Sequence, residues 1–234
     1  MNKQSNLYTI IYIIVLVVVV GVALASTSLA LRDRQQENAL ADTKRQILAS
    51  VHIVPEKNQI TQDFDKYIVR QEVTDAQGQA VEDPEAVKIN MAAQIKLPDN
   101  ERRLPVFVCR LDDGATKYIV PVYGAGLWGP IWGYVAFDAD GSTIYGAYFA
   151  HQGETPGLGA EIEKPAFSDQ FEGKRVFIDG VFKPVAVVKA GQAPLNGEDY
   201  VNGISGGTIT SKGVGSMLDN CLTTYRKYLE NLSK

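Results

Sequence analysis

Residues 104–149 read LPVFVCRLDDGATKYIVPVYGAGLWGPIWGYVAFDADGSTIYGAYF, and this stretch decides the fold of the chain. Four runs within it are rich in β-branched and aromatic residues, which favour β-strands. These runs span residues 104–108, 118–122, 131–137 and 143–149. The turn sequence Asp112-Asp113-Gly114 separates the first run from the second, and Asp138-Ala139-Asp140-Gly141 separates the third from the fourth. We therefore predict that the second and third strands pair with their neighbours as antiparallel hairpins.

Shorter elements are predicted on both sides of these strands. Residues 60–97 mix short apolar runs with polar turns, which indicates one or two strands and a short helix. Downstream, the pattern predicts a loop at Gly153–Gly159, a helical turn at Phe167–Phe171, and strands at Arg175–Ile178 and Val185–Lys189.

The C-terminal segment predicts a helix from about Lys212 to Leu232, with Ser211 as its N-cap. Its apolar residues, from Met217 to Leu229, recur at the i, i+3, i+4 spacing of a helix with one buried face. Together the predicted elements define an α+β domain, with a mixed or antiparallel sheet and flanking helices.

The N-terminal segment is apolar. There is no charged residue between Lys3 and Arg32, and Leu7–Leu31 consists mostly of Ile, Val, Leu and Ala. Because a helix of about 20 residues crosses the hydrocarbon core of a bilayer, we predict one transmembrane helix. A cleaved signal peptide is the alternative, since Ser28-Leu29-Ala30 resembles a cleavage site. The apolar run exceeds the roughly 7–15 residues of a signal core, which favours the retained helix.

The predicted organisation has three parts: a transmembrane anchor at residues 1–33, a helical stalk at 34–55 and one domain at 56–234. The stalk prediction depends on helix-prone sequence from Arg34 to Val51, which Pro55 would end. Positive charges are almost balanced on the two sides of the anchor, so they do not indicate on which side of the membrane the domain lies.

Composition excludes several classes of function. The 234 residues carry a formal net charge of −4, so no basic surface indicates nucleic acid as a partner. Cys109 and Cys221 are far apart in the sequence and only two histidines accompany them, so no metal site is predicted. Two buried thiols are the favoured state of these cysteines, and one disulfide is the alternative.

Ser205-Gly206-Gly207-Thr208-Ile209-Thr210-Ser211 is the most informative short segment. Two glycines permit close approach of the backbone to another group, and three hydroxyls follow them. The N-terminus of the predicted helix lies just beyond, where free N–H groups favour a phosphate. A simple capping turn is the alternative interpretation. No lysine follows at the position of a P-loop, which argues against a nucleoside triphosphate.

Two further segments could bind a flat cofactor. Residues 151–159 combine His151, a carboxylate and a hydroxyl with three glycines and a proline. In residues 123–129, glycines flank Trp128, whose ring could stack on an isoalloxazine. The alternatives are a structural turn for the first segment and a core tryptophan at a bulge for the second.

These segments resemble the FMN-binding domain family. Residues 205–211 are similar to its flavinylation motif, usually Ser-Gly-Ala-Thr, and Glu154–Gly159 matches its Glu-Thr-Pro-Gly-Leu-Gly signature without change. The resemblance implies that a flavin transferase joins the phosphate of FMN to Thr208 as a phosphoester. Two positions depart from the pattern: Gly207 replaces the usual alanine, and Asn202 replaces an upstream acidic residue.

The resemblance also implies roles for other residues. We expect ring contacts from Trp128, Thr155 and Leu158, with Glu154 at the polar edge of the ring and His151 at the loop boundary. Lys189 would place a positive charge near the flavin. The predicted cofactor site is completed by Ser205, Gly206, Gly207, Thr210 and Gly159. No catalytic residue is predicted, because the cofactor itself would carry out the redox chemistry.

Gly126–Trp128 and the Asp-x-Asp-Gly turn also resemble the family of the C subunit of sodium-translocating NADH:quinone reductases. This resemblance implies an electron relay in a six-subunit assembly that exports sodium. It also implies a single-pass protein of the bacterial inner membrane, anchored in lipid, with its flavin domain on the periplasmic side. The alternatives are the G subunit of an Rnf-type electron-transport complex and a membrane-anchored, non-redox assembly module.

Overall fold

A computed structural model describes residues 6–194 and 196–232. The chain divides into two compact units, Met1–Asp42 and Thr43–Lys234. The parts of the predicted anchor and domain that fall on residues 1–5, 195 and 233–234 lie outside the described residues.

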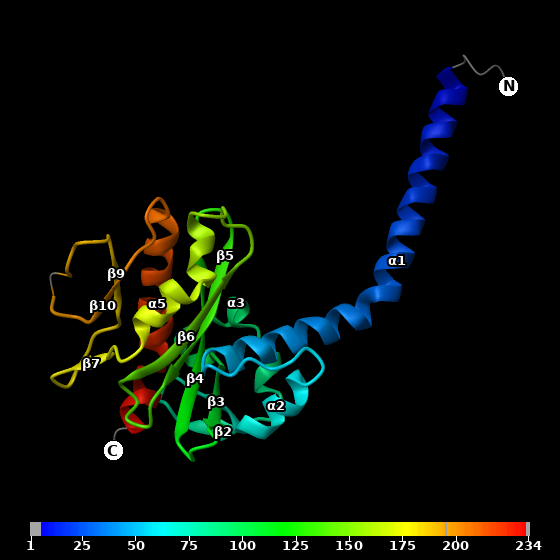
Figure 1. The fold of residues 1–234 in the computed structure, drawn as a ribbon. Helices are drawn as coiled ribbons and strands as arrows, with labels where there is room; N and C mark the ends of the chain where they lie inside the picture. Colours follow the sequence, from blue (N-terminus) through cyan, green and yellow to red (C-terminus); the bar gives the residue numbers. More distant parts are fainter. Residues whose placement is uncertain (1–5, 195, 233–234) are drawn as a thin grey trace. The chain divides into compact units, whose positions relative to one another are not determined.

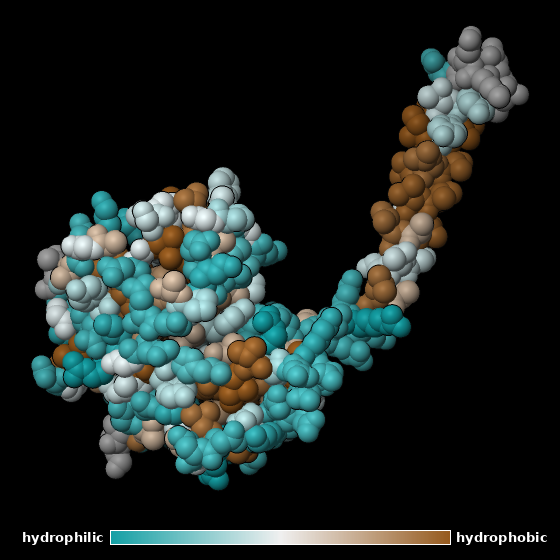
Figure 2. Space-filling model, in the orientation of Figure 1, coloured by the Kyte–Doolittle hydropathy of each residue, from teal (hydrophilic) through white to brown (hydrophobic). Residues whose placement is uncertain are grey.

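One long helix, α1, spans Asn6–Ala49. Apolar side chains gather along its N-terminal part, where they are exposed (Figure 2). Its length and composition suit a membrane-spanning helix, although a signal sequence would meet the same criteria. The helix continues without a break past residue 33 and ends at Ala49, before the predicted Val51, because residues 50–52 form a turn with His52 at φ 62°. The division into anchor, stalk and domain stays a prediction.

The second unit is built on a six-stranded antiparallel sheet in the order β2-β1-β3-β4-β5-β6 (Figure 1). The strands are β1 Ile68–Thr74, β2 Ala80–Glu82, β3 Leu104–Arg110, β4 Thr116–Ala125, β5 Pro130–Phe137 and β6 Ile144–His151. Strands β3 to β6 are the four runs predicted from residues 104–149, and the antiparallel hairpins are confirmed.

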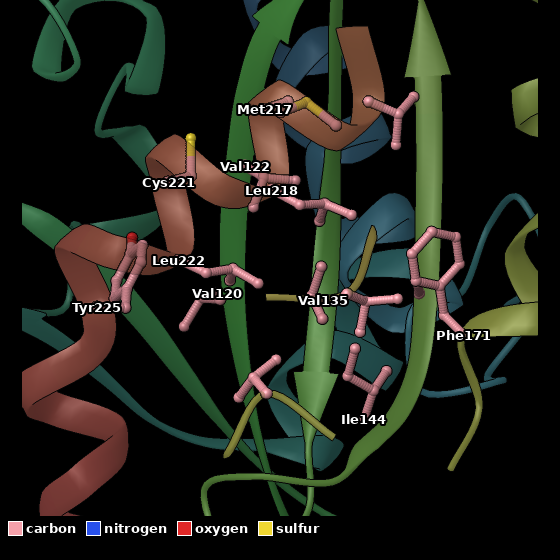
Figure 3. Packing of buried hydrophobic residues seen from close by; sticks show 14 of the residues in the cluster. Val120, Val122, Val135, Ile144, Phe171, Met217, Leu218, Cys221, Leu222 and Tyr225 are labelled. Carbon is pink, nitrogen blue, oxygen red and sulfur yellow. The ribbon is translucent and has the colours of Figure 1, made fainter. Parts of the chain in front are cut away.

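Both faces of this sheet are covered. On one face, Val120, Val122 and Val135 pack against Leu218 and Leu222 of α5, which spans Thr208–Leu232 (Figure 3). Neighbouring strand residues point to the opposite face, where a second core contains side chains of α2 (Ile60–Tyr67) and of residues 47–51. Burial on both faces explains why the strand sequences are almost continuously apolar rather than alternating.

Short elements complete the domain. The helices are α3 Met91–Gln94 and α4 Pro165–Ser168, and the 3₁₀ turns are Ala86–Lys88, Asp99–Glu101, Gly159–Glu163 and Asp169–Phe171. The strands are β7 Phe177–Ile178, β8 Val181–Phe182, β9 Ala186–Val188 and β10 Tyr200–Asn202. β9 and β10 pair in parallel, whereas β7 and β8 are antiparallel. The α+β prediction is confirmed, although the strand predicted from Arg175 is only two residues long.

The start of α5 differs from the prediction. The helix begins at Thr208, not near Lys212, and Ser211 lies inside its first turn instead of capping it. The Ser211 hydroxyl accepts the N–H of Ile204 at 2.8 Å, while the Ser211 N–H donates to the carbonyl of Gly207 at 2.9 Å. Because Gly206 takes φ +77°, the chain turns sharply enough to begin the helix early. Thr208 is therefore a helix N-terminal residue.

The two cysteines are separate, buried thiols, 0% exposed at Cys109 and 2% at Cys221. This confirms the favoured prediction over the disulfide.

Candidate functional site

A cavity of about 360 Å³ lies where two loops meet the start of α5, and we call it the loop pocket. One loop joins β4 to β5 and the other follows β6, which pairs with β5, so neighbouring strands position both loops. The lining residues are Leu127, Trp128, Glu154, Thr155, Leu158, Gly159, Gly206, Gly207, Thr208, Ile209 and Thr210.

The Glu154 carboxylate links the three segments. Its Oε2 accepts the Thr210 hydroxyl at 2.5 Å, and its Oε1 accepts the backbone N–H of Trp128 at 2.8 Å. The backbone N–H of Glu154 donates to Nδ1 of His151 at 3.1 Å. With Glu154 only 4% exposed, these bonds fix one loop to the other and both to α5.

Glu154 is ionised at neutral pH. Burial alone would raise the pKa of its carboxyl group, but hydrogen bonds from Thr210 and from the backbone N–H groups of Trp128 and Leu127 outweigh this effect. The net pKa lies below the ordinary value. The loop pocket therefore carries one fixed negative charge on its wall.

Two glycines make room for this carboxylate. A Cβ on Gly126 would come within 2.5 Å of Oε1, and a Cβ on Gly159 would collide with Oε2 and with the Thr210 hydroxyl. These contacts explain why the Gly-Leu-Trp and Glu-Thr-Pro-Gly-Leu-Gly segments carry glycine at these positions. Leu158 in turn lies against Gly206, where a Cβ would be 2.6 Å from its Cδ2.

The four hydroxyls of residues 205–211 are in different states. Thr210 and Ser211 are buried, and both are hydrogen-bonded as described above. Ser205 and Thr208 are exposed, and neither hydroxyl has a hydrogen-bond partner among the described residues. Of these two, Thr208 lines the loop pocket and Ser205 does not.

A second cavity of about 630 Å³ adjoins the first. The two cavities share Gly206 and Thr208 in their linings, so Thr208 lies at their junction. Ser205 and Lys189, predicted as cofactor contacts, line this second cavity rather than the loop pocket.

The loop pocket contains every other residue of the predicted site except His151. His151 lines neither cavity; it ties its loop in place, with its Nε2 also 3.8 Å from Oε1 of Glu163. Sequence reasoning missed Leu127 and Ile209. Each is apolar and is the immediate sequence neighbour of a predicted residue, and that position was the available signal.

The two departures from the family pattern are accommodated locally. An alanine Cβ at Gly207 would lie 3.1 Å from the Ile204 side chain, which is tight. Asn202 exchanges backbone hydrogen bonds with the Gln170 amide, donating at 2.9 Å and accepting at 3.4 Å, so the segment before the turn is held in place.

The residues of the loop pocket fit a flavin mononucleotide. Leu127, Trp128 and Leu158 offer exposed apolar surface to a flat ring. Gly206 and Thr208, where α5 begins, lie at the junction with the second cavity. The first N–H groups of α5 have no acceptor within the helix, so this junction suits a phosphate. Among the described residues, no group of histidine, cysteine and carboxylate side chains could hold a metal ion.

Comparison with known proteins identifies the family. Residues 126–223 match the FMN-binding domain family. The C subunit of the Na(+)-translocating NADH-quinone reductase from Vibrio anguillarum is 34% identical over 233 residues, covering 93% of this chain and 91% of that protein. The Yersinia pestis C subunit is 33% identical over 233 residues, covering 91% and 87%. The crystal structure of the Parabacteroides distasonis C subunit shares 47% identity with a TM-score of 0.79, covering 85% of this chain and 96% of that one.

Fold and site together define a flavoprotein domain of the FMN-binding type. Within the described residues, one long apolar helix precedes this domain in the sequence. More specifically, the chain belongs to the family of the C subunit of the Na(+)-translocating NADH-quinone reductase. It is thus part of an oxidoreductase complex, and the resemblance to this family is confirmed over the Rnf-type alternative.

Substituting alanine for Gly159 should lower the free energy of unfolding by about 1–3 kcal/mol, because a Cβ there overpacks the Glu154 and Thr210 side chains. Gly153→Ala is the matched control: a Cβ at Gly153 would meet no atom within 4 Å, so stability should change by less than about 1 kcal/mol. Denaturant unfolding of the detergent-solubilised chain measures both. Equal stability of the two variants would contradict the packing described here.

Proposed function

We propose that this chain carries FMN covalently, through a phosphoester on Thr208, and relays electrons with it. In the transfer step, Oγ1 of Thr208 bonds to the flavin-side phosphorus of FAD. The phosphorus–oxygen bond of the diphosphate breaks, AMP leaves, and the hydroxyl proton passes to a base of the flavin transferase.

The state of the Thr208 hydroxyl is the observation that carries the proposal. Thr208 is exposed, lacks a hydrogen-bond partner among the described residues and borders the loop pocket. Thr210, two residues further on, is 1% exposed, and its hydroxyl is engaged by Glu154. Within segment 205–211, a transferase therefore meets one available hydroxyl at the loop pocket, that of Thr208.

The chain positions and protects the cofactor. Bound FMN would supply the electron-transfer chemistry. Trp128, Thr155 and Leu158 would contact its ring, and Glu154 would hold the surrounding loops rigid, with a fixed charge near the polar edge of the ring. Preorganised contacts of this kind set the potential of a bound cofactor.

The place of this relay is within a membrane complex. The protein would pass electrons from NADH towards quinone in a six-subunit assembly, and the complex as a whole would couple this transfer to sodium export. α1 would anchor it in the lipid of the bacterial inner membrane, with the flavin domain on the periplasmic side. Covalent attachment suits that side, because lost FMN could not be replaced there.

Thr208→Ala should abolish covalent flavin, because no other hydroxyl among the described residues of segment 205–211 is both free and at the loop pocket. Intact-mass analysis after co-expression with a flavin transferase should find one FMN on the wild-type chain and none on the variant. Thr223→Ala is the control and should keep the cofactor, since Thr223 is an exposed residue of α5 that lines neither cavity. Flavin that remains on denatured Thr208→Ala protein would refute this attachment site.

Trp128→Ala should raise the midpoint potential of the bound flavin by about 20–60 mV, the equivalent of one aromatic contact in a one-electron step. The reason is that an electron-rich indole face favours the oxidised ring over the reduced one. Spectroelectrochemical titration measures the shift. Val181→Ala, 54% exposed and outside the loop pocket, should leave the potential unchanged. An unshifted Trp128→Ala protein would remove the ring contact from the proposal.

Val54→Cys should report the orientation of the domain, because Val54 is 87% exposed. A membrane-impermeant maleimide should label it equally in intact and in lysed cells. The native thiols give little background: both are buried, and burial raises the pKa of Cys109 to about 11 and raises that of Cys221 as well. Labelling only after lysis would place the domain in the cytoplasm instead.

A further inference from the structure

The second cavity has the character of an anion site. Lys189 and Lys212 both line it, one shortly after β9 and the other in the early part of α5. Both lysines are exposed, and neither forms an ion pair with any described residue. Among the described residues, no carboxylate lines this cavity. Its other lining residues are Val187, Val188, Ala190, Gln192, Gly203, Ile204, Ser205, Gly206, Thr208 and Ser211. We call this second cavity the lysine cavity.

The two cavities beside Thr208 therefore differ in charge. The loop pocket carries the Glu154 carboxylate, whereas the lysine cavity carries two ammonium groups. A phosphodiester is an anion, so its repulsion by Glu154 and its attraction to the lysines act in the same direction. The flavin ring is uncharged, so Glu154 does not repel it and the lysines do not attract it in this way. The apolar surface of Trp128 and Leu158 in the loop pocket suits the ring better than the lysine cavity does.

We propose that the lysine cavity binds the phosphate of the FMN on Thr208, through Lys189 and Lys212, while the loop pocket takes the ring. This assignment rests on the proposed function and divides the cofactor between two cavities that share the attachment residue. Ammonium groups bind phosphate through charge-assisted hydrogen bonds, which are stronger than neutral ones. Both lysines become binding residues of the site, and Lys212 was not expected from the sequence.

Non-covalent binding separates the phosphate from the ring. In Thr208→Ala protein no ester can form, so the affinities of FMN and riboflavin, which lacks the phosphate, can be compared by fluorescence quenching. FMN should bind about tenfold more tightly at low salt, the discounted effect of charge-assisted contacts on exposed lysines. Added Lys189→Gln or Lys212→Gln should reduce this preference and leave riboflavin affinity unchanged. Lys57→Gln, an exposed lysine outside the cavity, should change neither.

Equal binding of FMN and riboflavin would overturn the proposal, and so would lysine variants that weaken both ligands alike. If Thr208→Ala protein binds neither flavin, the ³¹P resonance of the ester in the flavinylated wild-type chain decides. That resonance should shift in Lys212→Gln and not in Lys57→Gln; no shift would refute the assignment. A wild-type chain that never gains covalent FMN refutes the attachment instead, and the FMN–riboflavin comparison still tests the cavity.

Discussion

The hydrogen bond from Thr210 to Glu154 is the interaction on which the functional part of the molecule depends. It joins the loop after β6 to the first turn of α5, and the same carboxylate holds the loop after β4 through the backbone of Trp128. One buried, ionised side chain thus positions all three walls of the loop pocket. Removing a partner would leave a buried charge or hydroxyl unsatisfied, which is more costly than the bond alone suggests.

Much of the fold followed from sequence because local and long-range preferences agree. The four apolar runs of residues 104–149 became β3 to β6, and turn residues between them set the hairpins. The start of α5 did not follow, because Ser211 has the residue type of a helix cap. Its hydroxyl instead satisfies the N–H of Ile204, a contact that depends on the turn made possible by Gly206.

Most residues that line the loop pocket could be predicted from the sequence, but the hydrogen bonds among them could not. Motifs identified the three segments that form the loop pocket, since glycines and hydroxyls at fixed spacing are visible in a sequence. Which hydroxyl is engaged and which is free depends on Glu154, a residue 56 positions from Thr210. Lys189 and Lys212 came together only through the pairing of β9 with β10 and the docking of α5, so their shared cavity had no sequence signal.

Thr208 is the first residue of α5, and the buried face of the same helix, from Val214 to Leu229, packs in the main core of the domain. A group esterified there would be attached to a rigid helix. It would differ in this from cofactors that are carried on long, flexible lysine side chains and move between distant active sites. Its reach would be short and its orientation constant with respect to the sheet. Donor and acceptor would then have to come to the flavin, so any gating of electron flow would fall to motions between the proteins of the assembly.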